Sequence, residues 1–271
     1  MEQLWDLMMD LVVLSPKKNW NLESEMLTVS RIRAMRGWCL SPLLAAITIM
    51  SAAAQNPLET LPNNYKLVME NEWARVIKVH YAPHEKVPVH SHTIGPAVYV
   101  YLADGGAVRF QHTEPQRMLA IRPPVTQGSF RMYHAVVERH EVENTSDLPS
   151  DFLRIELKAS TMENQRPTGR FEPPILAPGQ NLEKVEFEDD NIRIVRSVCW
   201  QHQVCDARQV LSAGLDIAFT PETLVQIGAK AEPIRLQAGQ VRWITPITNE
   251  VVFNSGEATS YRLRIEFKGA R

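Results

Sequence analysis

One sequence motif occurs twice, in nearly the same form, in this chain of 271 residues. Leu153-Arg154-Ile155-Glu156-Leu157-Lys158 recurs as Leu263-Arg264-Ile265-Glu266-Phe267-Lys268. A second pair of matching stretches lies upstream of these, at residues 70–79 and 188–197. Two units therefore open and close alike. A repeat of this length is typical of duplicated domains, because the repeats of solenoid proteins are only about 20–50 residues long.

Within each unit the pattern predicts β-strands. The runs at residues 98–102 and 107–110 are rich in β-branched and aromatic residues, and Asp104-Gly105 between them is a good hairpin turn. Short strands separated by turn residues favour a sandwich or a barrel. We therefore predict an all-β protein with two tandem barrels. The predicted segments are a leader over residues 1–54, a first domain over 55–159, a proline-rich linker over 160–182 and a second domain over 183–271.

Composition excludes some classes of function. The formal net charge is −2, with 44% hydrophobic and 22% charged residues, which is ordinary for a globular protein. The sequence shows no cluster of lysine and arginine with interleaved aromatic residues. We therefore expect no nucleic-acid partner.

The leader has the pattern of a secretory signal over residues 36–54. Arg31, Arg33 and Arg36 precede an apolar core, and Ala52-Ala53-Ala54 follows it. The core of about 13 residues is short for a membrane span, which needs roughly 20. The pattern predicts export to the periplasm or the medium, with no membrane association after cleavage; the alternative is an uncleaved anchor. A signal fits best if translation starts at Met26 or Met35 and not at Met1.

Two cysteines, Cys199 and Cys205, follow the leader. In an oxidising compartment they could form a disulfide, which would need a turn between them. The alternative is a pair of small buried thiols.

Seven of the eight histidines fall in the first unit, with His202 as the exception. The informative pair is His90-Ser91-His92, because residues i and i+2 of a strand point to the same face. Two imidazoles on the inner face of a barrel could hold a divalent metal.

The stretch Ala82–His92, followed by Val98–Leu102, resembles the first motif of the cupin superfamily. Residues 128–144 resemble the second motif, ending in His140 and Asn144. The resemblance implies a jelly-roll β-barrel in each unit and a metal site of His90, His92 and His140.

The sequence departs from the family pattern at one ligand. The first motif usually carries a glutamate four or five residues after its second histidine, where this chain has Pro96 and Ala97. Three histidines with open positions would accept one divalent transition metal: iron, zinc, manganese, copper or nickel. His84 and His134 are each candidates for a fourth ligand. His80 and His112 are expected to face solvent.

The second unit has lost all three ligands. Arg208, Val210 and Glu250 stand opposite His90, His92 and His140. Arg208 and Glu250 could form an ion pair that fills the barrel, or Arg208 could bind an anionic ligand.

Two functions of different classes follow from the resemblance. The first is a metal-dependent enzyme that acts on a small organic molecule, with dioxygenase or isomerase chemistry. The second is a non-catalytic module that binds a small molecule, or a structural cupin without metal chemistry. Glu85, Tyr99, Tyr101 and Arg109 are candidates for an acid–base role that spacing alone does not assign. The chain could be a monomer or a homodimer.

Overall fold

A computed structural model describes residues 56–92, 95–114, 116–133, 138–158, 170–228 and 232–270. Nearly all regular structure in these residues is strand, and the one helix among them is the four-residue α1 (Pro57–Thr60), capped by Asn56. The predicted all-β fold is confirmed. Nowhere in the described part of the chain is a helix long and apolar enough to cross a membrane.

The first half contains two antiparallel sheets. One has the order β1-β2-β9-β4-β7 and the other β3-β8-β5-β6. The bounds are β1 (Tyr65–Glu70), β2 (Ala74–Tyr81), β3 (Lys86–His92), β4 (Ala97–Tyr101), β5 (Val108–Glu114), β6 (Met118–Arg122), β7 (Phe130–Tyr133), β8 (Glu138–Asn144) and β9 (Ser150–Leu157).

The second half repeats the first large sheet, in the order β10-β11-β19-β13-β16, and divides the remaining strands between β12-β17 and β15-β14-β18. The bounds are β10 (Leu182–Glu188), β11 (Ile192–Cys199), β12 (Arg208–Val210), β13 (Gly214–Ala218), β14 (Glu222–Gln226), β15 (Ile234–Leu236), β16 (Val241–Ile244), β17 (Ile247–Glu250), β18 (Val252–Asn254) and β19 (Ser260–Phe267).

The repeated sequence motif forms β9 and β19, which lie at the centre of the two large sheets. Alternate residues of a strand point to opposite faces. The apolar set of β9 (Leu153, Ile155, Leu157) joins a core cluster that also contains residues of the second half. The charged set, Arg154 and Glu156, is buried on the other face, inside the first barrel. The two halves therefore bury apolar residues against each other and charged residues within themselves.

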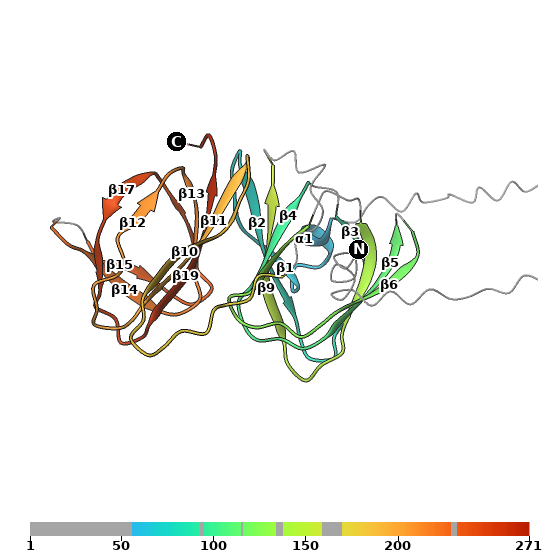
Figure 1. The fold of residues 1–271 in the computed structure, drawn as a ribbon. Helices are drawn as coiled ribbons and strands as arrows, with labels where there is room; N and C mark the ends of the chain where they lie inside the picture. The colour runs from blue at the N-terminus through green and yellow to red at the C-terminus, as the bar shows by residue number, and fades with distance from the viewer. Residues whose placement is uncertain are drawn as a thin grey trace, which may run out of the picture.

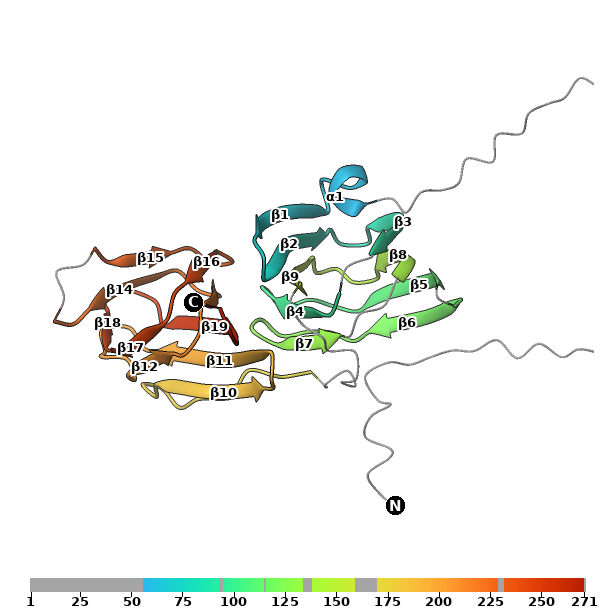
Figure 2. The ribbon, with the colours of Figure 1, turned by 90° about the horizontal axis from the view of Figure 1, so that it is seen from above.

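One apolar core joins the halves. It contains Val76 and Val98 from the first large sheet and Ile194 and Leu215 from the second, all fully buried. Figure 1 shows the two halves side by side, and Figure 2 shows them from above. At Gly128 the halves come so close that a Cβ atom would lie 2.2 Å from the Tyr261 hydroxyl, and its φ of +81° also favours glycine.

Cys199 and Cys205 form a disulfide, with Cα atoms 5.1 Å apart. The turn between them passes through His202, whose φ is +57°. Of the two alternatives for these cysteines, the structure has the disulfide.

The predicted leader over residues 1–54 lies outside the described residues. Of the predicted linker, residues 170–181 are described and contain no strand, although Phe171 pairs with Phe130 of β7 as an isolated bridge. The exact domain limits stay predictions.

Candidate metal centre

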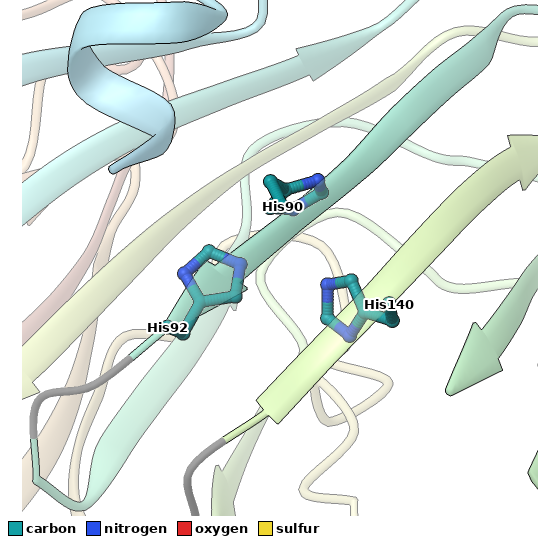
Figure 3. Close-up of side chains that lie close together, drawn as sticks. All are labelled: His90, His92 and His140. Atoms are coloured by element: carbon teal, nitrogen blue, oxygen red, sulfur yellow. The ribbon is translucent and has the colours of Figure 1, made fainter. Parts of the chain in front are cut away.

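Three buried histidines converge inside the first barrel. His90 and His92 lie two residues apart on β3, and strand pairing sets His90 opposite His140 of β8. The ring centroids are 4.8 Å apart for His90 and His140, 4.9 Å for His90 and His92, and 5.2 Å for His92 and His140. One ligand atom from each lies within 4.8 Å of the others, and Figure 3 shows the rings facing a common point.

The hydrogen bonds of His90 fix its tautomer. Its Nδ1 lies 2.9 Å from the Pro88 carbonyl oxygen, which can only accept, so Nδ1 carries the proton and donates. Its Nε2 is then an acceptor, and the Tyr65 hydroxyl donates to it at 2.7 Å. The Tyr81 hydroxyl lies 2.7 Å from that of Tyr65, whose own proton is already used, so Tyr81 donates to Tyr65.

The electrostatics keep the three imidazoles neutral. Burial lowers the pKa of His90 to about 4. Burial, with Arg154 nearby, lowers the pKa of His92 well below its usual range. Burial, with His90 nearby, does the same for the pKa of His140. Neutral imidazole is the form that binds a metal ion.

The residues present fit a transition metal. His140 Nδ1 is buried with no hydrogen-bond partner, and His90 presents an unprotonated Nε2. A set of three neutral imidazoles would suit iron, zinc, manganese, copper or nickel. His90, His92 and His140 would hold the ion.

His112 was expected to face solvent, and this prediction was wrong. Its side chain is buried, and its ring lies 5.1 Å from that of His140. Strand pairing sets His112 of β5 opposite His140, so both share the inner face. The period-two run Val108, Phe110, His112 was the signal that could have placed it inside.

Glu138 is a residue that the sequence reasoning missed. It lies two residues before His140 on β8 and is buried on the same face. With His112 and His140 it forms a second set of possible ligands, which shares His140 with the first. Ala97, which stands where the first cupin motif usually has a glutamate, is buried and offers no carboxylate. Glu138 is the acidic residue in the lining of the cavity beside the histidines.

The other candidate histidines do not join the cluster. His80 is exposed, as expected, and lies 2.8 Å from Asp151. His84, a candidate fourth ligand, is exposed in a turn and lies 2.8 Å from Asp147. His134, the other candidate, lies outside the described residues.

The acid–base candidates separate into two groups. Glu85 accepts hydrogen bonds from Asn64 and from the Ala82 backbone, which fixes the turn before β3. Arg109 is half-exposed and ion-paired with Glu143 on the outer face. Tyr99 and Tyr101 line the cavity beside the histidines.

That cavity is rich in arginine and tyrosine. Its charged lining residues are three arginines (Arg122, Arg131, Arg154) and one carboxylate, Glu138. Five tyrosines line it as well: Tyr65, Tyr81, Tyr99, Tyr101 and Tyr133. With the histidines neutral, the lining carries an excess of positive charge.

In the second half, Arg208 and Glu250 are in close contact and both buried. Strand pairing sets Arg208 opposite Glu250, just as it sets His90 opposite His140. Asp216, Arg262 and Glu222 continue the network, with Arg262 at 3.3 Å from Asp216 and 3.5 Å from Glu222. This arrangement favours the ion-pair interpretation; an anionic ligand held by Arg208 and Glu250 stays a prediction.

No family model and no curated protein matches the sequence. Solved structures do resemble it: AerE from Microcystis aeruginosa (12% identity, 75% of this chain and 97% of that chain covered, TM-score 0.50) and a cupin 2 conserved barrel domain protein from Leptotrichia buccalis (12%, 75% and 88%, 0.46). A third is salicylate 1,2-dioxygenase from Pseudaminobacter salicylatoxidans (14%, 72% and 71%, 0.41). The chain has the cupin fold; identities this low concern the fold alone.

Proposed function

We propose that this chain is an exported two-barrel cupin that binds one divalent transition metal in its first barrel and acts there on a small organic molecule. The observation that carries the proposal is the convergence of three neutral, buried histidines at the wall of a cavity. A binding cavity beside a metal site is the usual arrangement of a metalloenzyme centre.

The bound metal would act as a Lewis acid or as a centre for oxygen chemistry, the dioxygenase-type activity that the family resemblance implies. The chain's own residues have other tasks. Phe110, Phe152 and the tyrosines exclude water from the cavity wall. Arg154 is held in place: it donates to Glu156 Oε1 at 3.0 Å and to the Tyr99 hydroxyl at 2.5 Å. The position of the Tyr99 hydroxyl is therefore fixed.

One observation favours the alternative, a binding module without metal chemistry. The Tyr65 hydroxyl occupies His90 Nε2, so the hydrogen bonding of this histidine is complete without a metal. A metal would have to displace that hydrogen bond.

Metal content separates the two. The protein, purified from its native compartment, is assayed by elemental analysis with the variants His90→Ala and His140→Ala. We expect about one ion per chain in the parent and less than a tenth of that in either variant. His80→Ala, which removes an exposed histidine, is the matched control and should keep its metal. Undiminished metal in His90→Ala would refute the site, and a metal-free parent protein would favour the binding module.

Export is a separate part of the proposal. The disulfide between Cys199 and Cys205 supports it, because such bonds persist in oxidising compartments and are rare in the cytosol. N-terminal sequencing of the mature protein should find a start close to residue 55. A mature protein that retains residues 36–54 would instead favour the anchored form.

A further inference from the structure

Arginines at equivalent positions of the two barrels have different partners. In the second barrel, strand pairing sets Asp216 of β13 between Arg242 of β16 and Arg264 of β19. In the first, it sets Tyr99 of β4 between Arg131 of β7 and Arg154 of β9. Tyr99 therefore holds the place of Asp216, and Arg131 that of Arg242.

This single difference decides whether the arginine has a counter-charge. Arg242 donates to Asp216 Oδ2 from Nη2 at 2.7 Å and from Nε at 3.1 Å. Arg131 instead lies over the ring of Tyr99, with its Cζ 4.9 Å from the ring centroid, and its Nε is buried without a hydrogen-bond partner.

Arg122 of β6 is in a similar state. It donates to the Ser150 hydroxyl and to the Gly106 carbonyl, both at 3.0 Å, and its Nε also lacks a partner. Within the part of the chain that the structure describes, neither Arg122 nor Arg131 has a carboxylate at ion-pair distance. Arg154 in the same cavity is paired with Glu156 at 3.0 Å.

Arg122 is buried and Arg131 is partly buried, and a guanidinium group in such a place is unfavourable unless an anion accompanies it. Burial lowers the pKa of Arg122, and repulsion from Arg131 adds to that effect. The planar guanidinium group fits a carboxylate with two parallel hydrogen bonds. A molecule that enters this cavity is therefore best matched if it brings a carboxylate.

The size of the cavity limits the molecule. The cavity has a volume of about 50 Å³, whereas a single water molecule needs roughly 10–15 Å³. Apolar side chains line it as well, among them those of Phe110 and Phe152. This volume suits a compact acid.

We propose that Arg122 and Arg131 form a carboxylate-binding subsite beside the histidines, and that the small organic molecule of the first barrel is a compact carboxylic acid of a few carbon atoms. The inference rests on the proposed function only in that this acid is the molecule on which the metal acts. Binding of the acid through the arginines needs no metal.

The test is calorimetric titration of the full-length, metal-free protein with pyruvate, and with methyl pyruvate as the uncharged analogue of similar shape. We expect pyruvate to bind and the ester to bind at least tenfold more weakly. Arg131→Gln should weaken pyruvate binding at least tenfold. Tyr99→Asp, which copies the second barrel's counter-charge, should do the same.

Arg242→Gln is the matched control, since it removes the arginine at the same place in the second barrel, and pyruvate binding should be unchanged. Circular dichroism and thermal unfolding of each variant show whether it has folded. Equal binding of acid and ester, unaltered binding by Arg131→Gln, an equal loss in Arg242→Gln, or binding of inorganic phosphate alone would overturn the proposal. Pyruvate binding to a protein that never takes up metal would keep the subsite and refute only the metal chemistry.

Discussion

The two barrels share one framework and differ in what fills it. Arg154 and Glu156 in the first, and Arg264 and Glu266 in the second, make the same hydrogen bond from arginine Nε to glutamate Oε1. Each half also opens with the same ion pair, Arg75–Glu70 in one and Arg193–Glu188 in the other. The duplicated positions thus lie on corresponding strands of the two large sheets.

The interiors diverge at positions that strand pairing makes equivalent. Tyr65, His90, Tyr99 and His140 of the first barrel correspond to Glu183, Arg208, Asp216 and Glu250 of the second. In the second barrel, arginines and carboxylates neutralise one another. In the first, neutral rings stand at the positions of these carboxylates. The difference teaches that the second barrel pairs its buried arginines with carboxylates of the same chain, whereas the first leaves Arg122 and Arg131 without a carboxylate at ion-pair distance among the described residues.

The largest expected effect is a loss in the free energy of unfolding when an ion pair of the second barrel is removed. Asp216→Asn removes a carboxylate that faces Arg242 at 2.7 Å and Arg262 at 3.3 Å. Loss of one partner from a buried ion pair costs about 3–5 kcal/mol. Urea unfolding should show a loss of that size. Asp151→Asn, which removes an ion pair with the exposed His80, should cost less than about 1 kcal/mol. An equal loss in the free energy of unfolding for the two variants would contradict a stabilising role for the buried ion pairs of the second barrel.

The barrels should also respond differently to acid. Burial lowers the pKa of His90 to about 4 in the folded chain, whereas an unfolded histidine has a pKa of about 6.5. As the pH falls, His90 is therefore protonated in the unfolded chain before it is protonated in the folded chain. The stability is complete above about pH 6.5 and is lost as the pH falls toward 4. In metal-free protein His90 alone should cost about 2 kcal/mol between pH 7 and pH 5.

The second barrel should keep its stability over that range. Burial opposes ionisation of Asp216, but Arg262, Arg242 and Arg208 hold its pKa at about 2. Its contribution is present above the usual aspartate pKa and is lost only as the pH falls through about 2. Hydrogen exchange at pH 7 and pH 5, corrected for intrinsic rates, should therefore show lost protection in β3 and β8 but not in β12 and β13. Equal loss in both barrels would contradict this difference.

The sequence predicted the features that repeat or alternate. The matching stretches predicted two repeated units, and they form corresponding strands of the two large sheets. The spacing of His90 and His92 placed these two histidines on one face. The alignment that set Arg208 and Glu250 against His90 and His140 agrees with the strand pairing in the two halves. These predictions needed only the period of a strand and a comparison of the chain with itself.

Other features could not be read from one strand at a time. Tyr65 reaches His90 from a different sheet, and no spacing in the sequence relates the two. The apolar face of β9 packs against the second half, whereas its charged face lies inside the barrel. In a strand at a protein surface, the apolar face usually points to the interior and the charged face to solvent. Only the packing of the two sheets reveals which face is which.

The smallest expected effect concerns the Tyr65 hydroxyl, which would compete with a metal ion for His90 Nε2. Tyr65→Phe removes the donor to His90 Nε2 and leaves the ring that packs 5.0 Å from the histidine. Since a hydrogen bond contributes about 1 kcal/mol net, Zn²⁺ affinity should rise about fivefold, as measured by competition with a chelator. Tyr81→Phe, one hydrogen bond further from the histidine, should change the affinity less. A lower affinity in Tyr65→Phe would mean that the phenol assists the metal, and the first barrel would then be built to hold its ion and not merely to admit it.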